Sequence, residues 1–312
     1  MIPQTATKTI SRVAVYIFFT AALIALNYFT PRTNFVQLII LYSFLFVAYL
    51  HIIFYWKDDK HIKEAKFVSV ALRFLLLFSI PNLSDDFYRY IWDGSLMHHG
   101  INPFTYTPQQ LLNDPSLHQA AVKISDGNIY EHLNSEQYYS VYPPVGQFFF
   151  FITAKICHLT KGGLLLNIFI LKFFILLSEI GTIYFLSKIL NHLNFSSKNI
   201  LLYALNPLII LELTGNIHFE AVTIFFLAAS IYFLLKHRYF LSAVLFGLSV
   251  ATKILPLILL PFLLKYIGFR KTIVYSSITA IVFIISFIPF YNAGLIRHFL
   301  ASLQLYFASF EF

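Results

Sequence analysis

The chain has 312 residues, of which 58% are hydrophobic and only 12% are charged, and its formal net charge is +8. Soluble domains contain about 25% charged residues, so this composition excludes a water-soluble enzyme, a disordered chain and a coiled coil. The basic residues flank apolar stretches instead of forming a soluble patch with aromatic partners, which argues against nucleic-acid binding. One cysteine, Cys157, cannot make an intrachain disulfide. The composition therefore predicts a polytopic membrane protein.

Ten apolar stretches are candidate membrane spans, because a spanning helix needs about 20 apolar residues and fewer where the membrane is thin. In chain order they cover residues 12–30, 35–56, 67–81, 145–159, 164–190, 200–213, 219–235, 239–251, 255–267 and 273–290. The N-terminus lacks a short apolar core followed by a small-residue cleavage site, so we expect the first stretch to be an anchor and not a removed signal peptide. Asn206 and Pro207 interrupt the stretch at 200–213, which predicts a broken or re-entrant helix there.

The distribution of charge orients the chain in the membrane. Lysines follow the second stretch at Lys57, Lys60, Lys63 and Lys66, as expected for a cytoplasmic loop. Seven of the 14 acidic residues lie between Asn82 and Pro144, where the only Lys or Arg residues are Arg89 and Lys123. We therefore expect three parts, namely N-terminal transmembrane helices at 1–81, an acidic extracytoplasmic loop at 82–144 and a transmembrane helical bundle at 145–312.

The beginning of the acidic loop, SDDFYRYIWDGSLMHHGINPF at 84–104, carries strong helix signals. Ser84 is a good N-cap residue, Asp85 and Asp86 fall in the first turn, and Gly100 is a stop signal, so a helix of about four turns is predicted. One face of this helix carries Asp86, Arg89, Tyr90 and Asp93. The pattern predicts an amphipathic helix at the membrane surface that presents carboxylates on one side.

Two interpretations of these acidic residues are open. The carboxylates can simply complement the helix dipole and pair with Arg89, which lies four residues from both Asp85 and Asp93. Alternatively, a carboxylate where the chain leaves the membrane can accept a proton from a hydroxyl group, or hold a divalent cation that bridges a phosphate.

Five motifs, SDDFYRYIWDG, HHGINPF, VYPPVGQ, ALNPLIILELTGNIHFEA and ATKILPLILLPFLL, follow one another along the chain. In this order and spacing, residues 67–312 resemble the GT-C superfamily of integral membrane glycosyltransferases. The chain is most similar to the bacterial alpha-1,6-mannosyltransferases that use a polyprenyl-phosphate sugar. This resemblance implies an all-α, polytopic transmembrane helical bundle whose extracytoplasmic loop contains interfacial helices.

The resemblance also implies a catalytic aspartate early in the first large loop. Asp86 matches that position, with Tyr88, Tyr90 and Gly94 aligned behind it, and Asp85 completes an acid pair. Relatives continue beyond the equivalent of Phe312 with further spans, so we expect the chain to be part of a longer protein. A second family motif, Asn-x-His-Asn-Asp, is represented here by Asn216, His218, Phe219 and Glu220, so that Glu220 replaces the acidic residue.

Further polar residues lie in apolar surroundings. Asn216, His218 and Glu220 are candidates for hydrogen bonds to sugar hydroxyl groups or for support of the catalytic acid; His218 and Glu220 do not share a helix face, so we expect no metal site from that pair alone. Glu179 and Glu212 are either functional or engaged in helix–helix hydrogen bonds.

Lys253, just before Pro256, can neutralise a phosphate as a point charge, or its side chain can extend to the membrane interface. The aromatic residues at 148–151 are interpreted as lipid-facing packing. The sequence has no glycine-rich phosphate loop and no spaced Cys or His cluster, so a nucleotide-sugar, ATP or zinc mechanism has no support.

Together these observations predict a membrane glycosyltransferase that moves a sugar, mannose by resemblance, from a polyprenyl-phosphate donor to an extracytoplasmic glycan or lipid acceptor with inversion. Asp86 is the expected general base and Asp85 assists it, directly or through Mg²⁺ or Mn²⁺ bound by both carboxylates. The expected substrate-binding residues are Arg89, Tyr90, Asp93, Asn216, His218, Glu220 and Lys253. We expect membrane lipids and no nucleic acid as further partners, and a bacterial inner membrane with the site facing outward. A sugar-lipid translocase and a scaffold of an envelope complex are the alternatives.

Overall fold

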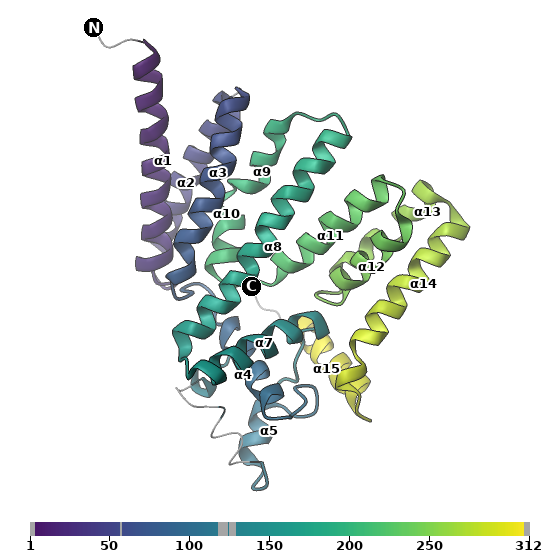
Figure 1. Cartoon of the computed structure of the whole chain (residues 1–312). Coiled ribbons are helices and arrows are strands. Elements are labelled where there is room, and N and C mark those ends of the chain that lie inside the picture. Colours follow the sequence, from purple (N-terminus) through teal and green to yellow (C-terminus); the bar gives the residue numbers. More distant parts are fainter. Residues whose placement is uncertain (1–3, 57, 118–123, 125–128, 309–312) are drawn as a thin grey trace. The chain divides into compact units, whose positions relative to one another are not determined.

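The computed structural model describes residues 4–56, 58–117, 124 and 129–308, with the backbone alone at 4–11, 303 and 305–308. Lys57 and Lys123, which entered the charge argument, lie outside these ranges. All regular secondary structure in the described ranges is helical (Figure 1), which confirms the predicted all-α class.

Four described helical segments are long and apolar enough to span a membrane: Arg12–Phe29, Phe35–Tyr55, Leu164–His192 and Phe269–Phe290. A fifth candidate is the pair Pro207–Gly215 and Glu220–Leu235, which is bent by 115° and forms either a broken span or a re-entrant loop. The helix break expected near Pro207 is therefore present, although the sharpest bend follows Gly215. Four other predicted spans fall on shorter helices, because α3 (Asp59–Leu75) and α7 (Pro144–Thr160) have 17 residues each, α12 (Tyr239–Val250) has 12 and α13 (Phe262–Ile267) has 6.

The chain divides into two compact units, and long helix α8 (Leu164–His192) contributes to both. The first unit comprises Met1–Ser84 and Ile175–His218. Its helices are α1 (Gln4–Phe29), α2 (Phe35–Tyr55), α3 (Asp59–Leu75), the end of α8, α9 (Leu201–Ala204), α10 (Pro207–Ile209) and a π-helix at Ile210–Gly215. Leucine and isoleucine side chains fill its core, which includes Leu23, Leu26, Leu45, Ile52 and Leu205.

A buried ion pair joins three helices of this first unit. Arg73 of α3 and Glu179 of α8 are fully buried, and Nη2 of Arg73 lies 2.8 Å from Oε2 of Glu179. Arg73 also donates to the carbonyl oxygen of Ala204 at 2.7 Å, and the Tyr203 hydroxyl donates to Glu179. Of the two interpretations of Glu179, the structure therefore shows the satisfied helix–helix contact.

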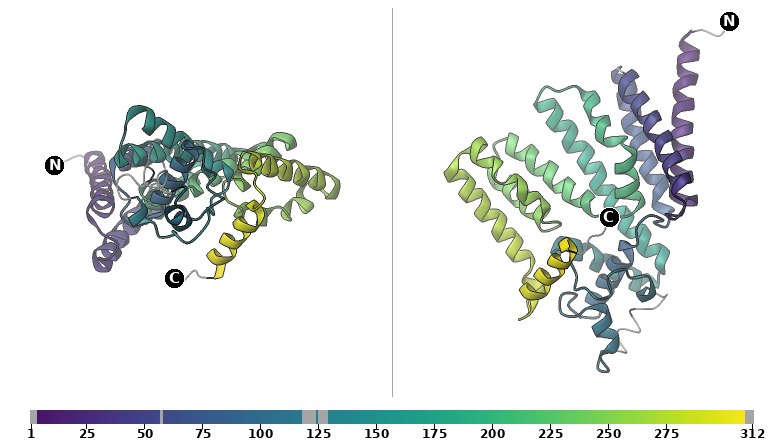
Figure 2. Two further views of the ribbon diagram at one scale, coloured as in Figure 1. Left: turned by 90° about the horizontal axis from the view of Figure 1, so that it is seen from below. Right: turned by 180° about the vertical axis from the view of Figure 1, so that it is seen from behind.

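The second unit comprises Asp85–Phe174 and Phe219–Phe312. Its helices are α4 (Asp86–His98), α5 (Pro108–Asn113), α7, the start of α8, α11 (Glu220–Leu235), α12, α13, α14 (Phe269–Ser286) and α15 (Leu295–Ala308). Helix α4 packs on α7, and α12 packs on both α11 and α14, so that α11, α12 and α14 lie side by side (Figures 1 and 2). This unit holds the acidic loop and most of the predicted site residues.

Small residues allow the closest helix contacts in the second unit. Gly94 of α4 faces the backbone of Phe150 in α7, where any side chain would collide with the carbonyl group. Gly247 of α12 similarly faces Val282 of α14, and the buried hydroxyl groups of Ser230, Ser242 and Tyr275 are joined by hydrogen bonds. The contact at Gly94 therefore sets the distance between α4 and α7.

Candidate functional site

Helix α4 begins one residue later than predicted. Asp85, not Ser84, is its N-cap residue, and no side chain makes a capping hydrogen bond, so the predicted Ser84 cap is wrong. The helix covers 13 residues, close to the predicted four turns. Asp85 and Asp86 are both half-buried, and Nδ2 of Asn134 donates to Oδ1 of Asp86 at 3.4 Å. Both carboxylates therefore lie at the positive end of the helix dipole.

The polar face of α4 is covered and not open as the amphipathic pattern predicted. Asp93 is completely buried: one oxygen accepts from Nε of Arg89 at 2.8 Å, and the other accepts from Ser140 at 2.5 Å and from Gln147 at 2.9 Å. Arg89 in turn donates to the carbonyl oxygen of Tyr138 at 3.0 Å. The loop before α7 therefore closes over α4 through this network, a long-range contact that helical spacing does not contain. The geometry favours a structural role for Arg89 and Asp93 over the substrate contacts expected from the sequence.

Two tyrosines lie between the acidic end of α4 and the start of α11. Tyr90 is buried, its ring stacks on Phe150 at 4.6 Å between centroids, and it meets the Tyr142 ring edge-on at 4.9 Å. Burial, then the neighbouring Tyr142, Asp86 and Glu220, raise the pKa of Tyr90 well above 10.0. Burial and Asp86 likewise raise the pKa of Tyr142. Both phenols therefore keep their protons and stay available as hydrogen-bond donors.

Glu220 and Lys253 form an ion pair beside these tyrosines. Glu220 is the first residue of α11 and Lys253 follows the end of α12; their side chains are 40% and 42% exposed. Asp86 and Glu220, from separate parts of the sequence, both lie near enough to Tyr90 to raise the pKa of its phenol, and Lys253 pairs with Glu220. A partly open ion pair is accessible to an incoming anion.

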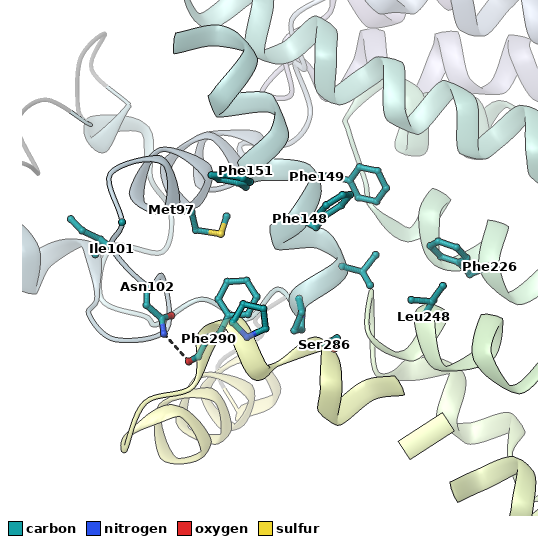
Figure 3. A pocket seen from close by; sticks show the side chains of 14 residues that line it. Met97, Ile101, Asn102, Phe148, Phe149, Phe151, Phe226, Leu248, Ser286 and Phe290 are labelled. Atoms are coloured by element: carbon teal, nitrogen blue, oxygen red, sulfur yellow. Dashed lines mark hydrogen bonds between the residues drawn. The ribbon is translucent and has the colours of Figure 1, made fainter. Parts of the chain in front are cut away.

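An apolar cavity of about 620 Å³ lies in the same unit (Figure 3). Its wall comes from the end of α4, from α7, α11 and α12, and from the end of α14. Met97, Phe148, Phe149, Phe226, Leu248 and Phe290 are among the lining residues, and Asn102 closes one side by donating to the carbonyl oxygen of Phe290 at 2.7 Å. Phe148, Phe149 and Phe151 thus line a cavity, and Phe150 supports Tyr90, so interpreting 148–151 as lipid-facing packing alone was wrong.

Asn216 and His218 belong to the first unit, where both lie next to Glu212 of the π-helix. Nδ2 of Asn216 donates to Oε2 of Glu212 at 3.2 Å, and Nδ1 of His218 lies 3.5 Å from the same oxygen. The Tyr42 hydroxyl donates to the other carboxylate oxygen at 3.3 Å. The carboxylate of Glu212 therefore organises the polar residues that follow Gly215.

Sequence inspection missed Tyr142 and Phe150 as site residues. Tyr142 belongs to the motif VYPPVGQ, and its place in that motif was the available signal. Within the part of the chain that the structure describes, no group of three or more His, Cys, Asp or Glu side chains could hold a metal ion. The two-carboxylate site at Asp85 and Asp86 therefore stays a prediction.

The fold and the site define a class of protein: a polytopic helical membrane protein in which half-buried acidic residues and an apolar cavity share the same helices. The family model described as alpha-(1->6)-mannopyranosyltransferase, N-terminal domain, matches residues 19–268. The chain therefore belongs to this family of mannosyltransferases, which confirms the resemblance seen in its motifs. Searches among curated proteins and among solved structures found no match.

Proposed function

We propose that the protein transfers mannose from a polyprenyl-phosphate donor to a hydroxyl group of a glycan or glycolipid, on the outer face of a bacterial inner membrane. The proposal rests on one observation: the polar candidate residues lie on the same helices that line the apolar cavity. Asp86 and Met97 lie on α4, Glu220 and Phe226 on α11, and the cavity lies alongside. A lipid-linked sugar phosphate has the same two-part character, with a charged head and an apolar tail.

The dimensions of α4 suit such a donor. Met97 lines the cavity and lies 11 residues after Asp86, which is about 16 Å along a helix axis. The cavity volume of about 620 Å³ is within the range of ordinary ligand sites. Part of an isoprenoid tail fits this space while the sugar phosphate reaches the acidic end of the helix.

Asp86 is our proposed general base. Its carboxylate accepts the proton of the acceptor hydroxyl while that oxygen forms a bond to the anomeric carbon. The bond from this carbon to the phosphate oxygen breaks at the same time, and polyprenyl phosphate leaves with the electron pair. Attack from the face opposite the phosphate inverts the anomeric centre. The phenols of Tyr90 and Tyr142 keep their protons near Asp86, so they add polar groups without adding charge.

Lys253 is our proposed partner for the departing phosphate. Its ion pair with Glu220 is partly exposed, so a phosphate can take the place of the Glu220 carboxylate. Asp85 and Asp86 present two adjacent carboxylates, a donor set that suits Mg²⁺ or Mn²⁺ when phosphate oxygens complete the coordination. A bound cation would supply additional positive charge at the phosphate.

The test is an assay of sugar transfer by the purified protein in detergent with radiolabelled donor and acceptor. Asp86→Asn should lower kcat by about 10²–10⁴-fold, the usual contribution of a general base. Asp114→Asn makes the same carboxylate-to-amide substitution elsewhere in the loop and should leave kcat unchanged. Full activity of Asp86→Asn would remove the proposed base. Absence of transfer by the wild-type protein, together with movement of the labelled lipid between leaflets of a vesicle, would favour the translocase.

A further inference from the structure

Glu212 lies at the centre of a polar cluster in the first unit. It belongs to the π-helix Ile210–Gly215, and isolated π-helical turns are frequent at functional sites. Its carboxylate receives hydrogen bonds from Tyr42 at 3.3 Å and from Asn216 at 3.2 Å, and it lies 3.5 Å from Nδ1 of His218. All three contacts converge on one side chain from two parts of the sequence.

The carboxylate determines how its two C-terminal neighbours are oriented. A carboxylate oxygen accepts hydrogen bonds, so it faces the NH₂ group of Asn216 and Nδ1 of His218. This orientation directs Oδ1 of Asn216, an acceptor, and Nε2 of His218 away from the carboxylate. Oδ1 of Asn216 is buried and makes no hydrogen bond within the described part of the chain, as is also true of Oγ1 of Thr214. Buried acceptors of this kind require a donor from water or from a ligand.

The backbone around this cluster is strained, as is common at functional sites. Ile217, between Asn216 and His218, is buried and has a φ of 59°, a left-handed conformation that is unfavourable for a β-branched residue. Gly215 in the same turn has no room for a side chain, because an added Cβ atom would lie 2.5 Å from Nδ2 of Asn27. The turn is therefore fixed, while the side chains of Glu212 and His218 remain 33% and 26% exposed. A ligand can reach the imidazole without opening the core.

We infer that Glu212 is a positioning residue for sugar recognition, an inference that rests on the proposed function. It holds the imidazole of His218 so that Nε2 forms a hydrogen bond with a sugar hydroxyl, and it holds the amide of Asn216 so that Oδ1 accepts from a second hydroxyl or from a bound water. Donor and acceptor both carry such hydroxyl groups, and the separate KM values for the two substrates identify which one is bound.

The experiment compares Glu212→Gln, His218→Gln and the double variant in the mannose-transfer assay. Each single substitution should raise KM for one and the same substrate by about tenfold, the effect of losing one strong hydrogen bond. Because the two residues act together, the KM of the double variant should not exceed the KM of the single variant with the larger increase. Glu64→Gln is the matched control, since it removes a carboxylate from the Arg12–Glu64 ion pair of the same unit and should change neither KM.

Several outcomes would overturn the inference. Unchanged KM values in Glu212→Gln, or effects of the two single variants that multiply in the double variant, would each contradict the positioning role. Should Glu212→Gln fail to fold in a thermal melt, Glu212→Asp retains the charge but shortens its reach: a raised KM supports the inference, and an unchanged KM makes the role purely structural. Transfer that is lost in Asp86→Asn but unaffected by Glu212→Gln refutes this inference alone, whereas a wild-type protein that transfers no mannose refutes the proposed function.

Discussion

The contact between Gly94 and Phe150 offers a sharp test of whether α4 positions the acidic residues. A Cβ atom added at Gly94 would lie 2.7 Å from the carbonyl carbon of Phe150 and 3.3 Å from Cβ of Ala154. Carbon atoms in contact are normally about 3.5–4.0 Å apart. Since the obstacle is backbone and cannot rotate away, Gly94→Ala should push α4 away from α7 by roughly 1 Å.

The expected effect on stability is small, but the effect on activity is large. Overpacking of this kind costs about 1–3 kcal/mol, and replacement of a helical glycine by alanine returns about 1 kcal/mol. The net loss is therefore about 0–2 kcal/mol. Asp86 lies two turns before Gly94 on the same helix, and a displacement of about 1 Å at a reacting group can reduce the rate about 100-fold.

Gly146→Ala is the matched control, because it adds the same methyl group to α7. The nearest atom to its new Cβ would be Cζ of Phe150 at 3.5 Å, an ordinary contact. Thermal melts and the transfer assay should therefore show Gly94→Ala folded but about 100-fold slower, and Gly146→Ala folded and active. If a folded Gly94→Ala protein has the wild-type kcat, the distance between α4 and α7 does not set the geometry of the site.

Three further substitutions test other parts of the structure. Lys253→Met should raise donor KM or lower kcat by about tenfold or more while leaving acceptor KM unchanged, because it removes the cation of the proposed phosphate site; a wild-type donor KM and kcat in this variant would refute that assignment. Glu179→Gln leaves the charge of Arg73 buried without its partner and should cost about 3–5 kcal/mol, so an unaltered thermal melt would contradict the ion pair's importance. His158 is exposed, but limited desolvation and two neighbouring histidines, His99 and His98, the latter stacked at 3.9 Å, lower its pKa below 6.5. Its contribution to stability is complete above pH 6.5 and is lost as the pH falls through the folded-state pKa, so His158→Gln should flatten the acid-side decline in melting temperature.

The sequence predicted the local features of the fold well, because helix signals are local. The end of the first loop helix and the break near Pro207 both followed from residues within one or two turns of them. The N-cap at Ser84 failed because the chain enters α4 without any side-chain cap. The burial of α4 also escaped prediction, since it depends on a distant loop that bonds to Arg89 through Ser135 and Tyr138.

The same difference between local signals and tertiary contacts applies to the candidate site. Asp86 and Glu220 were found from residue type and motif, but their approach to one phenol depends on tertiary packing that spacing does not describe. Tyr142 was overlooked because a tyrosine beside two prolines has an ordinary explanation as a helix start. The phenylalanines of α7 were overlooked because a cavity wall and a lipid-facing surface have the same composition.

The different burial of two aspartates on one helix predicts different roles for them. Both oxygens of Asp93 already accept from protein donors inside the core, so Asp93→Asn would leave the Arg89 guanidinium buried without its charge partner and should destabilise the protein by about 3–5 kcal/mol. Asp86 is half-buried at the helix end, and Asp86→Asn should leave the melting temperature nearly unchanged while removing activity. The pair therefore predicts opposite responses, loss of folding for one and loss of catalysis for the other, measured by thermal melt and by mannose transfer. A stable Asp93→Asn protein with low activity would instead place Asp93 in the reaction and return it to the substrate-binding role expected from the sequence.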